Sequence, residues 1–164
     1  MNKTNRLVVL VAIAFATATA FAQTNAQKAF NAIKNMPGTW EQHSPDGRTL
    51  RVNFKVVSGG TAVMSEILIP NEDMISMIHL DGPNRLLLTH YCGAGNQPRM
   101  QASVSPDGKV ITFNFFDGTN IPPDGGYMQR MVLTLIDDNH HTEEWTFLDH
   151  GKEHKEFFDL HRTL

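Results

Sequence analysis

The sequence predicts an all-β protein: a single antiparallel up-and-down β-barrel of about ten strands with a short N-terminal helix. Two observations lead to this prediction. Ten strand-like runs follow one another after residue 38, and clusters of Pro, Gly, Asp and Asn separate them at near-regular intervals. The connections are short, so neighbouring strands are expected to be antiparallel. A meander of this length avoids exposed edges by closing on itself.

The expected elements are bounded by residues that favour their ends. A short helix is expected over Ala26–Asn35. Turns are expected where Pro pre-sets one dihedral angle and Gly accepts a positive φ, as in the two Ser-Pro-Asp-Gly segments that begin at Ser44 and Ser105. The expected strands are Thr39–Ser44, Thr49–Val57, Thr61–Ile69, Met74–Leu80, Arg85–Cys92, Arg99–Ser105, Val110–Asp117, Tyr127–Ile136, His141–Leu148 and Lys152–Arg162.

Residues 1–22 predict a secretory signal peptide. A short basic segment with Lys3 and Arg6 precedes an apolar run, and Ala20-Phe21-Ala22 is the small-x-small pattern that signal peptidase cuts. The apolar stretch of about 16 residues is short for a bilayer span of about 20. We therefore expect cleavage before Gln23, a barrel domain over residues 23–164, and no stable membrane anchor after cleavage. The expected location is periplasmic or secreted.

Composition narrows the classes of function. The chain has a formal net charge of −3 and no basic cluster, which argues against a nucleic-acid partner. Its length suits one domain with one core. The single cysteine, Cys92, excludes an intramolecular disulfide, and a buried free thiol is the simpler interpretation. The oligomeric state is left open.

Hairpin pairing predicts which side chains face the barrel interior. In the second run, Leu50, Val52, Phe54 and Val56 alternate with polar residues, so they should face the core. Pairing Ser44 with Arg48 places Trp40 opposite Val52, also inward. Pairing Leu80 with Arg85 and Leu148 with Glu153 then defines two more inner faces. These are Met77, His79, Leu86, Leu88, His90 and Cys92, and then Glu143, Trp145, His154, Glu156, Phe158, Leu160 and Arg162.

Two features resemble known barrels. Gly38-Thr39-Trp40 on the first strand, with Arg162 near the end of the last, is similar to the barrel-closing pair of the calycin superfamily, in which a guanidinium covers the indole. The segment Leu88–Met100 and several shorter ones resemble exported, uncharacterised bacterial lipocalin-like proteins, with a more distant similarity to nitrobindins and fatty-acid-binding barrels. The resemblance implies a fold and a compartment but no activity.

The polar residues around one hairpin and its loop form the candidate ligand site. The expected function is the binding of a small apolar or amphipathic molecule inside the barrel, because barrel mouths are common ligand sites. A satisfied internal hydrogen-bond network is the alternative for the same residues. The predicted ligand-binding residues are Glu66, Met77, His79, His90, Cys92, Asn96, Gln97 and Arg99, and the predicted closure pair is Trp40 with Arg162.

Catalysis and cofactors are the competing interpretations. An enzyme would use His90 with Cys92 or with Glu66. Late-strand histidines at His154 and His161 are the positions for a haem ligand, but Trp40-Glu41-Gln42-His43 departs from the glycines that follow the Trp in nitrobindins. The methionines show no dense Met-x-x-Met run for copper(I) and are simpler to interpret as core residues. We expect no catalytic residues, no metal and no cofactor.

Overall fold

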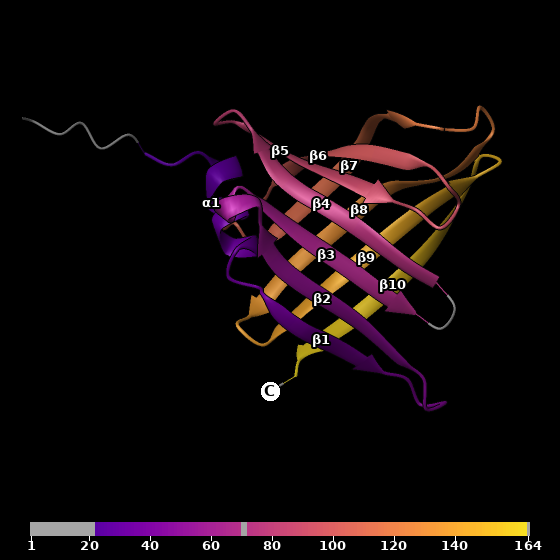
Figure 1. Ribbon diagram of the computed structural model, residues 1–164, viewed down its shortest axis with the longest axis horizontal. Helices are drawn as coiled ribbons and strands as arrows, with labels where there is room; N and C mark the ends of the chain where they lie inside the picture. The colour runs from indigo at the N-terminus through magenta and orange to yellow at the C-terminus, as the bar shows by residue number, and fades with distance from the viewer. Residues whose placement is uncertain (1–21, 70–71, 164) are drawn as a thin grey trace, which may run out of the picture.

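The computed structural model describes residues 22–69 and 72–163, and in this part of the chain ten strands close into one antiparallel barrel (Figure 1). Each strand pairs with its neighbours in sequence, and the last returns to pair with the first, which confirms the predicted fold class. Residues 1–21, which make up almost all of the predicted signal peptide, lie outside the described residues. The elements are α1 (Asn25–Ile33), β1 (Gly38–His43), β2 (Thr49–Val57), a 3₁₀ turn (Ser58–Gly60), β3 (Ala62–Ile69), β4 (Glu72–Asp81), β5 (Arg85–Tyr91), β6 (Gln97–Val104), β7 (Val110–Thr119), β8 (Gly125–Asp137), β9 (His140–Asp149) and β10 (Lys152–Arg162).

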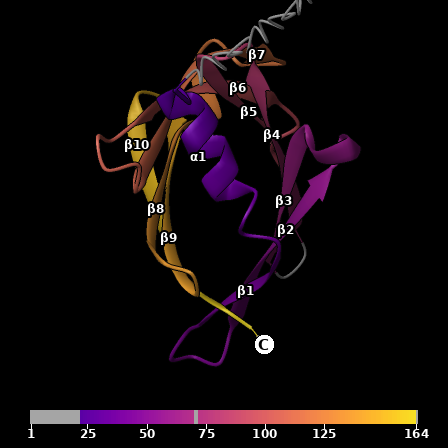
Figure 2. The same ribbon diagram turned by 90° about the vertical axis from the view of Figure 1, so that its left-hand side faces the viewer.

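Helix α1 lies across one end of the barrel, which we call the helix end (Figure 2). It starts with a capping box: the Gln27 backbone N–H donates to the Thr24 hydroxyl, and the Thr24 N–H donates to the Gln27 side chain. Its buried residues Ala26, Ala29, Phe30 and Ile33 repeat every three to four positions and join the core. Among the described residues, no helix is long and apolar enough to cross a membrane.

The barrel interior is filled by alternate residues of the strands. Trp40 pairs with Val52 in the predicted register, and the even-numbered residues of β2 face inward. The opposite end of the barrel, which we call the loop end, carries the turns at residues 44–48, 92–96 and 120–124. The largest fully buried side chains are Trp40, Trp145, Phe113, Ile33, Ile78, Leu86, Leu88, Met100, Ile111, Met131, Leu133 and Leu160.

In the hairpin of β4 and β5, the observed register differs from the predicted register by one residue. Asp81, not Leu80, pairs with Arg85, and Ser76, not Ile75, pairs with His90. A one-residue slip turns every side chain of a strand to the other face. Met74, Ser76 and Ile78 are therefore the buried residues of β4, and the predicted inward orientation of Met77 and His79 is wrong. The prediction for β5 holds, because His90 is fully buried.

Candidate functional site

The predicted closure pair is present at the helix end. The Arg162 guanidinium carbon lies 4.2 Å from the centroid of the Trp40 ring, within the range of a cation–π contact. Arg162 also donates to the carbonyls of Pro37 at 2.7 Å and Asp138 at 3.1 Å. A Cβ on Gly38 would lie 3.1 Å from the Arg162 guanidinium, and Gly38 has a φ of +128°. Glycine two residues before the indole therefore makes room for the arginine.

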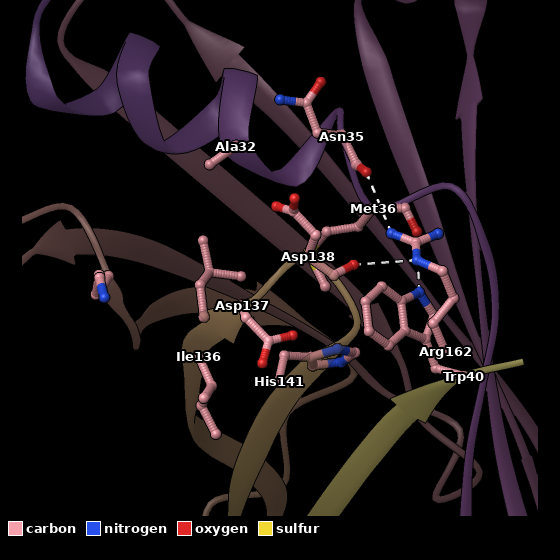
Figure 3. Close-up of a pocket in the computed structure, with 11 residues that line it drawn as sticks. Ala32, Asn35, Met36, Trp40, Ile136, Asp137, Asp138, His141 and Arg162 are labelled. Atoms are coloured by element: carbon pink, nitrogen blue, oxygen red, sulfur yellow. Dashed lines mark hydrogen bonds between the residues drawn. The ribbon is translucent and has the colours of Figure 1, made fainter.

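A pocket of about 310 Å³ opens beside this pair, between α1 and the turn that follows β8 (Figure 3). Its apolar lining includes Met36 and Leu135, and its polar lining includes His141 and the two acids Asp137 and Asp138. The Trp40 indole N–H donates to the Met36 carbonyl at 2.9 Å, so that the indole is held from both sides. The full lining is Ala32, Asn35, Met36, Trp40, Lys109, Leu135, Ile136, Asp137, Asp138, His141 and Arg162. We call this the helix-end pocket.

A buried carboxylate holds the histidine of this pocket in place. Glu143 is fully buried; its Oε2 accepts from the Trp145 indole N–H at 2.8 Å, and its Oε1 lies 3.4 Å from His141 Nε2. Buried carboxylates are tolerated when such donors surround them. The other ring nitrogen of His141, Nδ1, is buried and has no hydrogen-bond partner among the described residues. The His141 ring also meets Trp40 edge-on, with centroids 4.3 Å apart.

His90 is a second buried imidazole, deeper in the barrel. Its Nδ1 lies 3.0 Å from the Ser76 hydroxyl, and its ring lies 4.9 Å from the Trp145 ring. Burial lowers its pKa from 6.5 to about 4, because an imidazolium would lose its hydration there. His90 is therefore neutral at pH 7. It points inward as predicted, but it does not line the helix-end pocket.

Cys92, Asn96 and Gln97 lie at the loop end, away from the helix-end pocket. Burial raises the pKa of the Cys92 thiol, and the Glu72 carboxylate raises it further, so the thiolate form is disfavoured. Asn96 is buried and donates to the Gly126 carbonyl at 2.7 Å, which ties the β5–β6 turn to the start of β8. Gln97 donates to the Gly95 carbonyl and accepts from Thr119. These contacts are those of a hydrogen-bonded barrel rim.

Four predicted ligand-binding residues lie on the outer surface of the barrel. Glu66 accepts from Asn53 outside the barrel, because its neighbours Ser65 and Ile67 face inward. Met77 and His79 face outward in the observed register of β4 and β5. Arg99 is exposed and forms an ion pair with Asp117 on β7. The barrel wall thus separates Glu66 from His90, and the two cannot act together in catalysis.

The two candidate haem positions also lie apart from the pocket. His154 is exposed near the loop end, and His161 is exposed on the outer face, where it stacks on His140. Neither imidazole lines the helix-end pocket.

Sequence reasoning missed the residues that the structure brings together. The pairing of Leu148 with Glu153 is correct and places Glu143 and Trp145 on the inner face. The sequence signal for these residues was Glu143, an acidic residue at an inward position two residues from both His141 and Trp145. Carboxylates are almost never fully buried unless they are paired, so this pattern indicates a buried polar network.

Comparisons with known proteins support the fold alone. No protein-family model matches the chain, and no curated protein matches it. Among solved structures, the crystal structure of Rv2717c from M. tuberculosis matches with a TM-score of 0.54 and 16% sequence identity. The match covers 83% of this chain and 98% of that chain. The two proteins share a barrel architecture, and at this identity the likeness extends no further.

Proposed function

We propose that this protein is an exported, calycin-like binding barrel that holds one small amphipathic molecule in the helix-end pocket. The observation that supports the proposal most is His141. Its Nε2 faces the buried Glu143 carboxylate, and its Nδ1 has no hydrogen-bond partner in the described part of the chain although the residue lines a pocket. A buried polar atom without a partner is costly unless water or a ligand group completes its bonding.

The pocket indicates the size and chemistry of the molecule. Its volume of about 310 Å³ lies at the lower end of the range of small-molecule sites, about 300–1,000 Å³. The molecule is therefore small rather than a long acyl chain. When Nε2–H donates to the Glu143 side chain, Nδ1 is an acceptor, so the ligand should supply a hydroxyl or amine donor. Met36 and Leu135 would cover its apolar part.

The site is also preorganised. Trp40 is fixed by Arg162 and by the Met36 carbonyl, and His141 is fixed by Glu143 and by its edge-on contact with Trp40. Side chains that are already ordered lose little conformational entropy when a ligand binds. The class of function is the one expected from the sequence, but the site moves to the opposite end of the barrel and to different residues.

Native mass spectrometry of the untagged protein, purified from the secreted or periplasmic fraction, tests the proposal. We expect a bound small molecule in the wild type and none in Ala32→Phe, which adds a ring to the pocket wall. Lys28→Phe adds the same ring to an exposed position of the same helix and should retain the molecule. A wild-type mass equal to that of the bare chain would contradict the proposal, as would a molecule that persists in Ala32→Phe.

A further inference from the structure

A second group of chemistry-bearing residues lies on the outside of the barrel, near the β1–β10 junction. His140 on β9 and His161 on β10 are direct cross-strand partners, and Asp159 lies two residues before His161 on the same face. The ligand atoms of these three residues all lie within 4.8 Å of one another. We call this the outer cluster. It shares no residue with the helix-end pocket.

Both imidazoles approach the same carboxylate oxygen. His140 Nε2 lies 2.6 Å and His161 Nε2 lies 3.9 Å from Asp159 Oδ1. The two rings are stacked, with centroids 4.2 Å apart and an angle of 21° between their planes. The register of β9 and β10 thus holds two nitrogen donors and one oxygen donor together at one point of the surface. A simple His–Asp ion pair would need only one of the rings.

The outer cluster lies on a strand that is held by a hydrogen bond, and it borders a shallow depression. The Asp159 backbone N–H donates to the Gln42 side chain at 2.6 Å, which fixes the strand at this residue. A shallow depression of about 550 Å³ lies beside the cluster and includes Asp159, His161, Glu41 and His43. Glu41 pairs with His161 across the β1–β10 junction. Solvent in this depression can therefore reach a further coordination position.

We propose that the outer cluster is a binding site for a borderline divalent transition metal, with His140 Nε2, His161 Nε2 and Asp159 Oδ1 as its protein ligands. Imidazole together with carboxylate favours Zn²⁺ and its neighbours over Mg²⁺ or Ca²⁺, which prefer oxygen ligands alone. Tetrahedral Zn²⁺ with bonds of about 2.0–2.1 Å needs ligand atoms roughly 3.3 Å apart. The present separations lie on both sides of that value, and side-chain rotation at this exposed surface reaches it. Three protein ligands leave one position for water.

Isothermal titration of the untagged, EDTA-treated protein with Zn²⁺ tests the site. We expect one Zn²⁺ per chain. His161→Ala and Asp159→Asn should each weaken binding by about tenfold or more, since the loss of an outer-shell partner alone costs about 10–100-fold. His150→Ala is the matched control, because His150 and Asp149 form an exposed His–Asp pair at 2.6 Å without a second imidazole. It should leave the affinity unchanged.

Thermal unfolding distinguishes a variant that has lost metal binding from one that has failed to fold. Without metal, both ligand variants should melt with the wild type because the two residues are exposed. Zn²⁺ should raise the wild-type Tm and leave the variants unchanged, because only a ligand of the native state stabilises it. The proposal is overturned if Zn²⁺ does not bind the wild type. Binding by His161→Ala with wild-type affinity, or equal weakening by His150→Ala, would also overturn it.

Discussion

The His90 imidazole is fully buried in the barrel interior. Within residues 22–69 and 72–163 its one hydrogen-bond partner is the Ser76 hydroxyl, and burial lowers its pKa from 6.5 to about 4. Glu143 shows the other solution to burial, since donors from Trp145 and His141 surround its carboxylate. A buried imidazole without an opposite charge nearby, such as His90, stays neutral. A buried carboxyl group, such as Glu143, is tolerated when hydrogen-bond donors contact it.

The His90 pKa predicts a pH-dependent stability. Well above pH 6.5, the ring is neutral in both the folded and the unfolded chain. As the pH falls from 6.5 toward 4, His90 becomes protonated in the unfolded chain but stays neutral in the folded chain. The free energy of unfolding therefore decreases over this pH range. Between about pH 7 and pH 5 the loss should be about 2 kcal/mol. Urea unfolding at both pH values measures it.

A pair of variants isolates this effect from the titration of other groups. His90→Gln removes the ring and should lose about 2 kcal/mol less than the wild type over the same pH interval. His150→Gln changes an exposed histidine and should follow the wild type. If His90→Gln and the wild type lose the same stability, His90 does not titrate as described.

At the scale of strands and turns, the sequence predicted almost every element and missed one register. Each of the ten strands lies within about two residues of its expected bounds, because Pro, Gly and Asp mark the turns. In β4, however, both faces carry apolar residues, with Ile75 and Met77 on one face and Met74 and Ile78 on the other. Hydrophobic alternation therefore could not decide the register. The Asp81–Arg85 ion pair at 2.9 Å closes a turn one residue shorter than expected.

The candidate site depended on that register and was only partly predictable. Met77 and His79 were assigned from the hairpin in error, and Glu66 and Arg99 were chosen for their chemistry with no parity argument behind them. The closure pair was predictable because Gly38-Thr39-Trp40 and the late Arg162 resemble the closing pair of known barrels, in which a guanidinium covers an indole. The helix-end pocket was not predictable, because it depends on how α1 packs across strands far apart in the sequence.

The closure pair lies at the junction of β1 and β10, where Trp40 pairs with Arg162 and Glu41 pairs with His161. Trp40 is 1% exposed, so Trp40→Ala removes a large buried side chain from this junction. We expect a loss of about 3–5 kcal/mol in the free energy of unfolding. Arg162→Lys should also destabilise the fold, since lysine lacks the planar fork that covers the indole and bonds several carbonyls.

Denaturant unfolding monitored by circular dichroism measures both variants. Arg130→Lys is the matched control, because Arg130 is exposed on β8, and it should stay within about 0.5 kcal/mol of the wild type. Should Arg162→Lys be as stable as Arg130→Lys, the guanidinium contact would contribute nothing to closure.

At the scale of the whole molecule, the barrel has two different ends. The helix end is covered by α1, whose apolar face completes the core, while at the loop end Asn96 ties the β5–β6 turn to the start of β8. The cap of α1 is formed by Thr24 and Gln27, both of which follow the expected cleavage site. A chain that begins at Gln23 would therefore keep the complete helix and the pocket beneath it.

Maturation of the chain can be predicted from this arrangement. We expect cleavage after Ala22, so that intact-mass analysis of the exported protein gives a chain of residues 23–164. Replacement of Ala20 and Ala22 by bulky residues should block the cut, because signal peptidase requires small side chains at these positions. The purified 23–164 chain should melt cooperatively with the helix in place, since its capping box needs nothing upstream. An exported protein that retains Met1 would contradict cleavage and would favour an N-terminal anchor.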